Sequence, residues 1–327
     1  MSANRQLVVV LGIPFDVLSR EQVIARICEW VDSGEPHYLA TANVNFVAKA
    51  WRDPEFREIV AMADMITPDG MPILWAARLL GARLPERVTG ADLVPALARV
   101  ASEKRYRMML LGGEPRVGEA VVEKLKHRYP SLAVSSYAPP FNPLLEMNND
   151  KILAKVHEFR PDMLFVSFSA GKSEKWIRMN LGKLEVPVCA GVGATIDFMA
   201  GRVPRAPSWM QNVGLEWFYR LLKEPSRMWR RYSSDFLVFL FALCRYFTLY
   251  KMHRLLRRRS TSDAQSEVKT ASGGKVEVVA PERFDAATGK ALQREMADIL
   301  TEGRSVLMNL SRVRLLDSSG LGVLVAL

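Results

Sequence analysis

The chain has 327 residues, of which 49% are hydrophobic and 24% charged, so it can bury a core and is neither wholly disordered nor fibrous. Its length predicts more than one domain, and its three cysteines, far apart and without a CxxC pair, indicate a reducing compartment and no disulfide framework. The net charge of +10 lies in one segment, because residues 201–259 hold 13 basic and only 3 acidic side chains.

Strand-like runs alternate with helical patterns through the first 200 residues, and Ser19 and Gln22 are spaced as a capping box for the first helix. The predicted strands are Leu7–Leu11, Tyr38–Thr41, Met65–Ile66, Arg107–Leu111, Ala133–Ser136, Met163–Phe168 and Pro187–Ala190. The predicted helices are Arg20–Val31, Pro72–Leu80, Ala91–Ser102, Arg116–Arg128, Leu145–Phe159 and Ser173–Leu181. This alternation predicts an α/β fold, a parallel sheet with helices on both faces.

The basic segment at 201–259 also holds 12 of the 29 aromatic residues. Cations mixed with aromatic rings are typical of a surface that lies on an anionic membrane, and a solvated basic helix is the alternative. Nucleic-acid binding is a weaker interpretation, since no nucleic-acid-binding module accompanies the segment. The apolar run 236–244 is too short to span a bilayer. We therefore predict interfacial helices over 209–257.

A small, polar stretch at 260–275 reads as a flexible linker, and the pattern of strands and helices then restarts. We expect a strand at Val276–Val279, a helix at Asp285–Leu300, a strand at Ser305–Asn309 and a turn at Asp317–Gly320. The predicted organisation is a core at 1–200, a basic appendage at 201–259, a linker at 260–275 and a partial α/β unit at 276–327.

Two polar clusters follow predicted strands, where an open α/β sheet binds its ligands. One contains Thr41, Asn43 and Asn45, and the other contains Asp69 followed by Gly70. A lone carboxylate at this place can act as a general base on a hydroxyl nucleophile. The alternative is that Asp69 caps the helix beginning near Met71, and Asn43 and Asn45 can likewise start a helix.

Glycines close two further strands just before a helix, at Gly112 and Gly113 and at Gly191 and Gly193. This arrangement can cradle a phosphate, although a bare glycine pair is often only a tight turn. Neither place has a GxGxxG or GxxxxGK[ST] motif, and the chain has no Asp-x-Asp, no HExxH and no histidine cluster. We expect no nucleotide redox cofactor and no bound metal.

Five arginines, Arg205, Arg220, Arg227, Arg230 and Arg231, form a basic series in the appendage. Their forked donors suit a diphosphate, and contact with anionic lipid is the alternative. On one continuous helix Arg220, Arg227 and Arg231 would share a face, unless Pro225 ends that helix.

An ordered set of short motifs in this chain resembles the WecG/TagA/CpsF glycosyltransferases (family 26) over roughly residues 7–235. The matching motifs are Thr41–Asn43, Pro68–Gly70, Glu86–Leu93, Leu111–Gly113, Gly191–Gly193, Asp197–Phe198, Arg205–Pro207 and Gly214–Arg220. The resemblance implies a Rossmann-like core with a basic, membrane-associating appendage. It implies a metal-independent, inverting enzyme that moves a hexose, N-acetylmannosamine or a related sugar, from a UDP-sugar to a polyprenyl-diphosphate-linked sugar. That enzyme would work in surface polysaccharide biosynthesis on the inner face of the cell membrane.

The same resemblance assigns roles to individual residues. Asp69 matches the catalytic base and Thr41 a polar partner beside it, while Arg220, Arg227 and Arg230 match arginines that hold the donor diphosphate. The remaining expected substrate-binding residues are Asn43, Asn45, Arg87, Gly112, Gly113, Lys172, Glu174, Gly191, Gly193 and Arg205. One motif departs from the family, whose Gly-x-Pro-Lys-Gln-Glu becomes Ser169-Ala-Gly171-Lys172-Ser173-Glu174 here. This departure removes an amide and bears on the identity of the donor.

The last 52 residues resemble the first half of a STAS domain through the stretch Asn309–Gly322. That resemblance implies a phosphorylation site at Ser318 and a kinase or another protein as partner, whereas the residues alone are equally typical of a helix cap. A second class of function follows, a non-catalytic regulatory protein that works through this segment and the basic appendage. The altered stretch at 171–173 favours it, and the retention of Asp69, Thr41 and the arginine series argues against it.

Overall fold

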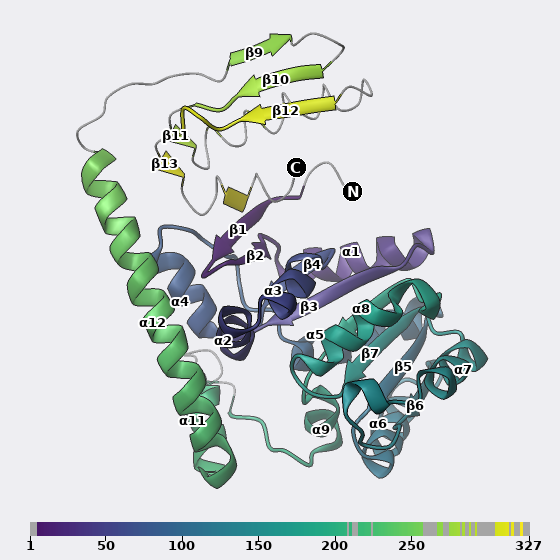
Figure 1. Ribbon diagram of the computed structural model, residues 1–327. Helices are drawn as coiled ribbons and strands as arrows, with labels where there is room; N and C mark the ends of the chain where they lie inside the picture. Colours follow the sequence, from purple (N-terminus) through teal and green to yellow (C-terminus); the bar gives the residue numbers. More distant parts are fainter. Residues whose placement is uncertain are drawn as a thin grey trace. The chain divides into compact units, whose positions relative to one another are not determined.

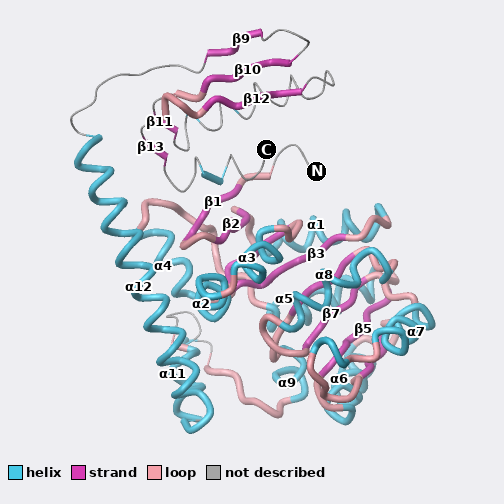
Figure 2. The backbone as a smooth tube through the Cα atoms, viewed as in Figure 1, coloured by secondary structure: helices cyan, strands magenta, loops and turns pink. Residues whose placement is uncertain are grey.

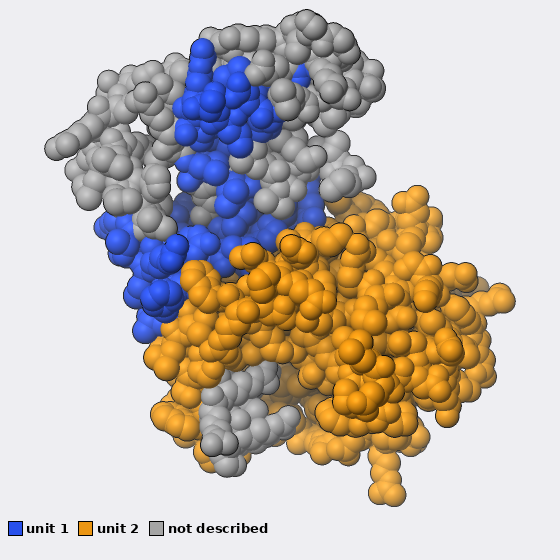
Figure 3. Space-filling model, viewed as in Figure 1, with its two compact units in different colours: residues 1–17, 75–84, 240–327 blue, residues 18–74, 85–239 orange. Residues whose placement is uncertain are grey.

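The computed structural model describes residues 5–207, 209–210, 215–223, 225–257, 267–270, 275–281, 283–284, 288, 292, 305–313, 315–316 and 321–322. The chain divides into two compact units (Figure 3). Unit 1 comprises residues 1–17, 75–84 and 240–327, and unit 2 comprises residues 18–74 and 85–239. Neither unit is one continuous segment, so the chain passes between them four times.

Unit 2 contains a six-stranded sheet in which every neighbouring pair is parallel, in the order β4-β3-β8-β7-β5-β6 (Figure 1). Its strands are β3 (His37–Ala42), β4 (Met65–Pro68), β5 (Arg107–Gly112), β6 (Ala133–Tyr137), β7 (Met163–Ser167) and β8 (Val188–Gly191). All six lie where the hydrophobic runs predict them. In register, Thr41 of β3 faces Thr67 of β4, and Ala40 faces Gly191 of β8.

Helices cover both faces of this sheet (Figure 2). On one face lie α1 (Arg20–Ser33), α5 (Gly90–Lys104), α6 (Pro115–Arg128) and α9 (Thr195–Ala200). On the other lie α2 (Val44–Arg52), α3 (Pro54–Ala61), α8 (Lys172–Leu184) and α7 (Asn149–Phe159), the last preceded by the 3-10 turn η1 (Leu144–Glu146). The predicted α/β, Rossmann-like fold is therefore confirmed.

The core of unit 2 follows from the apolar spacing of its elements. In α1 the buried residues Val23, Ile27 and Trp30 recur at the helical period, and the predicted capping box of Ser19 and Gln22 begins the helix. The strands are apolar on both faces, as in β5, where five successive residues are buried. Complete burial of one such large aliphatic side chain stabilises the fold by about 1.5–3 kcal/mol.

The first predicted strand forms, but it does not join the large sheet. In unit 1, β1 (Leu7–Val10) pairs antiparallel with β2 (Ile13–Asp16), and the two make their own two-stranded sheet. Leu11 and Gly12 connect them with φ angles of 52° and 86°, the left-handed turn that favours a tight hairpin. The turn sends the chain back on itself instead of into a crossover helix.

Further helices lie among the described residues. α4 (Met71–Leu79) follows β4, and α11 (Glu216–Lys223) precedes the long helix α12 (Pro225–Arg257). Pro225 is the first residue of α12, a position where its missing N–H costs nothing. Because the break at Pro225 separates Arg220 from Arg227 and Arg231, these arginines do not share a face of one continuous helix. In the part of the chain that the structure covers, no helix is both long and apolar enough to cross a membrane.

The C-terminal strands are β9 (Glu267–Thr270), β10 (Lys275–Val279), β11 (Arg283–Phe284), β12 (Ser305–Asn309) and β13 (Leu315–Leu316). β10 pairs parallel with β12 and antiparallel with β9, and β11 pairs parallel with β13. β9 lies inside the segment that the composition predicts to be a linker, because Val268 pairs with Val278 there. Parallel pairing of β10 with β12 needs a crossover connection. Most of the predicted helix at Asp285–Leu300 and all of the predicted turn at Asp317–Gly320 lie outside the described residues.

Candidate active site

Three residues of the expected site meet at the carboxyl edge of the sheet. Thr41 is buried and donates a hydrogen bond from Oγ1 to the carbonyl of Gly191 at 3.1 Å. The backbone N–H of Asp69, which follows β4, donates to the carbonyl of Ala42 at 2.9 Å. The helices that follow β3 and β8 lie on opposite faces, so the carboxyl ends of these strands form the crevice where open α/β sheets bind ligands.

The two asparagines of the first polar cluster support local structure. Asn43 caps α2, because its side chain accepts hydrogen bonds from the backbone N–H of Asn45 and of Phe46, at 3.0 and 3.4 Å. The Asn45 amide donates to Asp235 of α12 at 2.6 Å. The alternative reading of Asn43, a helix start, therefore accounts for its side chain.

The same contact fixes the first half of α12 onto α2. Arg52 donates to the hydroxyl of Ser234 at 2.9 Å and lies 3.9 Å from the carboxylate of Asp235. Asp235 is only 7% exposed, and a carboxylate buried to this degree needs polar partners such as Asn45 and Arg52. The helix after the strand that carries Thr41 and the helix that carries Arg227, Arg230 and Arg231 are thus tied together within unit 2.

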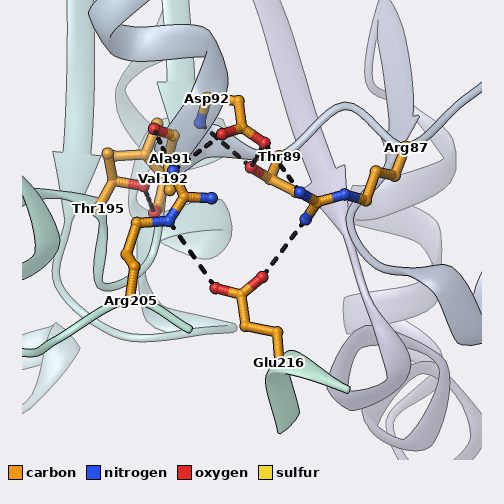
Figure 4. Close-up of polar contacts among 8 residues, drawn as sticks. All are labelled: Arg87, Thr89, Ala91, Asp92, Val192, Thr195, Arg205 and Glu216. Carbon is orange, nitrogen blue, oxygen red and sulfur yellow. Dashed lines mark hydrogen bonds and ion pairs between the residues drawn. The ribbon is translucent and has the colours of Figure 1, made fainter. Parts of the chain in front are cut away.

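Arg87 and Arg205 belong to a four-membered ion cluster (Figure 4). Arg87 lies 3.3 Å from Glu216 and 3.6 Å from Asp92, and Arg205 lies 2.8 Å from Asp92 and 3.9 Å from Glu216. Figure 4 shows the Glu216 carboxylate reaching up from α11 between the two guanidinium groups. Two cations and two anions give the cluster no net charge, and it attaches α11 to the start of α5.

The pKa of Asp92 in this cluster is shifted. Burial raises the pKa of Asp92, but the hydrogen bond and charge of Arg205, the hydroxyl of Thr89 and the charge of Arg87 together bring the net pKa below its ordinary value. Thr89 also caps α5, accepting from the Asp92 N–H at 3.1 Å. Beside it, a Cβ on Gly90 would lie 2.9 Å from the Thr195 hydroxyl, so glycine permits this close approach.

Glu174 lies beneath the crevice and is buried. Its carboxylate accepts a hydrogen bond from the backbone N–H of Gly171, and a Cβ on Gly191 would lie 2.3 Å from its Oε1 atom. Burial raises the pKa of Glu174 to about 7, opposed by backbone hydrogen bonds and by the charge of Lys49. This geometry favours a role in holding the loop before α8 over direct contact with a substrate.

The loop before α8 has Gly171 and Ser173 where the family has proline and glutamine, and its backbone differs accordingly. Gly171 has a φ of 89°, which proline cannot adopt, and a Cβ there would lie 2.8 Å from the Lys49 ammonium. The hydroxyl of Ser173, a buried residue, accepts from the Phe168 N–H at 3.1 Å. Lys172 donates to the carbonyl of Asn142, and its ammonium lies 5.1 Å from the centre of the Phe141 ring.

Glycines at the ends of β5 and β8 adopt backbone conformations that other residues rarely adopt. Gly112 has a φ of 108°, and a Cβ there would lie 2.6 Å from the Ser167 carbonyl, so only glycine fits. Gly113 and Gly193 also have left-handed φ angles, of 74° and 54°. Within the described residues, no group of three or more His, Cys, Asp and Glu side chains is placed to hold a metal ion.

Comparison with known proteins decides the family. The sequence profile described as "Glycosyl transferase WecG/TagA/CpsF family" matches residues 8–252. The chain belongs to this family. It is 31% identical to an N-acetylglucosaminyldiphosphoundecaprenol N-acetyl-beta-D-mannosaminyltransferase of Bacillus subtilis strain 168, over 65% of this chain and 84% of the relative. An enzyme of the same name from Staphylococcus aureus strain MRSA252 is 27% identical, over 70% of this chain and 89% of the relative.

As a WecG/TagA/CpsF glycosyltransferase, the protein has further expected site residues outside the described side chains. Arg220 lies on α11 and Arg227 and Arg230 lie on α12, but only their backbone is described. Ser318 lies outside the described residues altogether. The roles expected for these four residues stay predictions.

Sequence reasoning missed the partners of the predicted residues, although a signal for two of them was present. Glu216 and Asp235 are two of only three acidic residues in the basic segment 201–259. Isolated acids in a strongly basic stretch indicate specific ion pairs, and here they pair with Arg87 and Arg205 and with Asn45 and Arg52. Asp92 and Lys49 carried no comparable signal.

Proposed function

We propose that this glycosyltransferase moves N-acetylmannosamine or a related hexose from a UDP-sugar to a polyprenyl-diphosphate-linked sugar, with inversion at the transferred carbon. The names of the relatives, which describe mannosaminyl transfer to N-acetylglucosaminyldiphosphoundecaprenol, support this substrate class. The observation that carries the proposal is the placement of Asp69 beside Thr41 at the crevice of the sheet.

In the proposed mechanism Asp69 acts as the general base. It takes the proton of the acceptor hydroxyl as that oxygen attacks the anomeric carbon of the donor sugar. The bond between that carbon and the diphosphate breaks on the opposite side, so the configuration inverts and UDP leaves with the electron pair. Thr41, whose hydroxyl bonds Gly191, fixes the strand end beside the base.

The leaving diphosphate needs positive charge, and we assign this role to Arg220, Arg227 and Arg230. Arg87 and Arg205 are less suited to it, because Asp92 and Glu216 already neutralise them. In our proposal Arg87 and Arg205 instead hold α11 so that the basic series reaches the donor. Gly113 and Gly193, where an added Cβ would meet no atom closer than 3.9 Å, let the backbone approach the substrate.

We also propose that α11 and α12 lie on the inner face of the cell membrane. In α12 the residues Asp235, Phe239 and Ala242 are buried at the helical period. Large apolar side chains at other angles of the same helix are exposed, namely Trp229, Phe236, Leu237, Leu240 and Phe241. A helix with an apolar face turned to solvent and basic residues around it suits the headgroup layer of an anionic membrane.

The test is a transfer assay with the purified full chain. Incubation with a panel of UDP-sugars and a short polyprenyl-diphosphoryl-N-acetylglucosamine should release UDP only when donor and acceptor are both present. Release with UDP-N-acetylmannosamine would identify the donor. If no pair supports transfer while the chain still binds a protein partner through residues 276–327, the non-catalytic alternative would hold.

The resemblance of residues 276–327 to a STAS domain lies beyond the matched range 8–252. The parallel pairing of β10 with β12 is compatible with it. A regulatory role through Ser318 and a kinase or protein partner stays a prediction.

A further inference from the structure

The loop between β7 and α8 is held by a lysine from a different helix. Lys49, on α2, donates a hydrogen bond to the carbonyl of Ala170. The carboxylate of Glu174, a buried residue in the first turn of α8, accepts a hydrogen bond from the backbone N–H of Gly171. The carbonyl of Ala170 and the N–H of Gly171 belong to one planar peptide group. A cation and a carboxylate therefore bind opposite ends of a single peptide.

The two side chains select one of two orientations of that peptide. Gly171 has a φ of 89°, and glycine adopts φ angles of either sign, so its backbone permits the peptide to rotate by half a turn. The rotation would turn the carbonyl oxygen toward the Glu174 carboxylate and the N–H toward the Lys49 ammonium, and both contacts would be repulsive. The charges of Lys49 and Glu174 thus determine a conformation that the glycine leaves open.

This peptide lies beside the strand ends that form the crevice. An added Cβ on Gly191, the last residue of β8, would lie 2.3 Å from the Glu174 carboxylate, and the carbonyl of Gly191 accepts from Thr41. Lys49 lies on α2, which follows the strand that carries Thr41. Lys49 therefore links the helix after β3 to the loop after β7, and β8 lies between these two strands in the sheet.

The residue that follows this peptide is Lys172, which is expected to bind substrate. Its backbone N–H donates to the carbonyl of Ser169 at 3.0 Å, and its side chain donates to the carbonyl of Asn142. A half-turn of the preceding peptide would change the direction in which the chain enters α8 and would displace both contacts. The place of the Lys172 ammonium at this edge of the sheet thus depends on the orientation of the peptide before it.

We propose that Lys49 is a positioning residue for sugar transfer, which fixes the Ala170–Gly171 peptide together with Glu174 and so holds Lys172 at the edge of the crevice. Lys49 acts through this loop and is not itself a catalytic residue. The inference rests on the proposed function, because the loop serves transfer only if the crevice binds the UDP-sugar.

The experiment compares Lys49→Met, which removes the charge and the N–H donors, with Lys49→Arg, which keeps both. Steady-state transfer by the full chain is measured at pH 8, where Glu174 of the wild type is ionised because its pKa is about 7. Lys49→Met should raise the Michaelis constant for the UDP-sugar by about tenfold or more, the loss expected for one hydrogen bond to a charged group. The turnover number should fall by a smaller factor. Lys49→Arg should recover most of the loss.

Hydrogen exchange measured by mass spectrometry gives a readout that does not depend on activity. Lys49→Met should speed exchange in the segment 168–173, because the Gly171 N–H is protected only while the peptide keeps its orientation. Lys183→Met, at an exposed position on α8, is the matched control. It should change neither the exchange nor the kinetics.

Wild-type kinetics in Lys49→Met would overturn the inference and leave the proposed function standing. Equal losses in turnover and in thermal stability, with the Michaelis constant for the UDP-sugar unchanged, would also overturn it, because they would show that Lys49 only stabilises the fold. If the wild-type protein transfers no sugar with any pair of substrates, the inference and the proposed function are both wrong.

Discussion

Asp69 and Glu174 are both carboxylates near the carboxyl edge of the sheet, but their surroundings differ. Asp69 is half-buried at the end of β4, between the strand and α4. Glu174 is enclosed below the crevice and bonded to Gly171. In the proposed mechanism the first meets the acceptor hydroxyl, whereas the second supports the loop, so substitutions at the two positions should have different effects.

We expect Asp69→Asn to lower the turnover number by about 10²-fold or more, because loss of a general base typically removes 10²–10⁴ in rate. Donor affinity should remain close to that of the wild type, since the amide has the same shape. Single-turnover kinetics together with UDP titration would measure both quantities. Normal turnover in this variant would mean that Asp69 has a structural role and that the base lies elsewhere.

Glu174 makes stability depend on pH in the direction opposite to that of a salt-bridged acid. Its folded pKa is about 7 against an ordinary 4.5, so the folded state binds more protons between these values. The free energy of unfolding that this group contributes is therefore greatest below about pH 4.5. It falls by about 3 kcal/mol as the pH rises to about 7 and does not change further above that pH.

Glu174→Gln should remove this slope, because the amide stays neutral and still accepts from the Gly171 N–H. Urea denaturation of the wild type and the variant at pH 5 and pH 8 gives the comparison. Glu146→Gln, at an exposed position on η1, serves as the control. Parallel pH profiles for the wild type and Glu174→Gln would show that Glu174 is ionised in the folded protein throughout.

At the scale of elements, local sequence patterns predict most of the strands and helices of unit 2. Each of its six strands was predicted from an apolar run, and the capping box at Ser19 and the break at Pro225 were read correctly. The helices α2 and α3 were not predicted, although each has a local start signal. Asn43 caps α2, and Asp53 and Pro54 are the cap and first residue of α3. The hairpin partner of β1 was missed because Leu11 in a left-handed conformation is uncommon for that residue type.

The contact of Asn45 with Asp235 should control how α12 docks within unit 2. Asp235→Ala removes the acceptor of a 2.6 Å hydrogen bond and leaves a partly buried amide without that acceptor, a cost of about 1–3 kcal/mol in stability. If α12 also places Arg227 and Arg230, the Michaelis constant for the donor should rise more than the turnover number falls. Denaturation and steady-state kinetics would separate the two effects.

Asp235→Asn is the matched variant, because it keeps an oxygen that can accept the same hydrogen bond. It should recover most of the donor affinity lost in Asp235→Ala. An equal loss in both variants would show that the charge facing Arg52, and not the bond to Asn45, positions the helix.

At the scale of the whole molecule, the exposed apolar face of α12 predicts membrane attachment. Replacing both Phe236 and Phe241 with Ser should weaken binding to vesicles that contain anionic lipid, because both rings are more than half exposed. Sedimentation with vesicles at increasing salt concentration should also show decreasing binding, since the attraction of basic residues is screened. Met62→Ser, a change at an exposed apolar residue of another region, is the control.

Equal binding to neutral and anionic vesicles at every salt concentration would contradict the electrostatic part of this account. Unchanged binding of the Phe236 and Phe241 variant would contradict the apolar part.

The division into units could not be read from the sequence. Composition placed boundaries at 200 and 260, where charge and polarity change, but the compact units exchange segments at 17, 74, 84 and 239. Residues 75–84 belong to unit 1 although they continue α4 from unit 2. Such long-range grouping depends on contacts between distant parts of the chain, which local periodicity does not encode. The ion pair of Arg87 with Glu216 was not predicted for the same reason, because the two residues lie far apart in the sequence.

The interleaving of the two units sets an order in which the protein can be completed on the ribosome. Residues 1–17 leave the ribosome before any part of unit 2, whereas residues 240–327 of the same unit leave it after unit 2 is complete. Every segment of unit 2 is available once residue 239 has left the exit tunnel, so unit 2 can finish folding first. The β1–β2 hairpin is therefore synthesised before residues 18–239, and the last segment of its own unit is synthesised after them. A nascent chain interrupted after residue 239 would therefore carry a complete sheet and an orphaned hairpin.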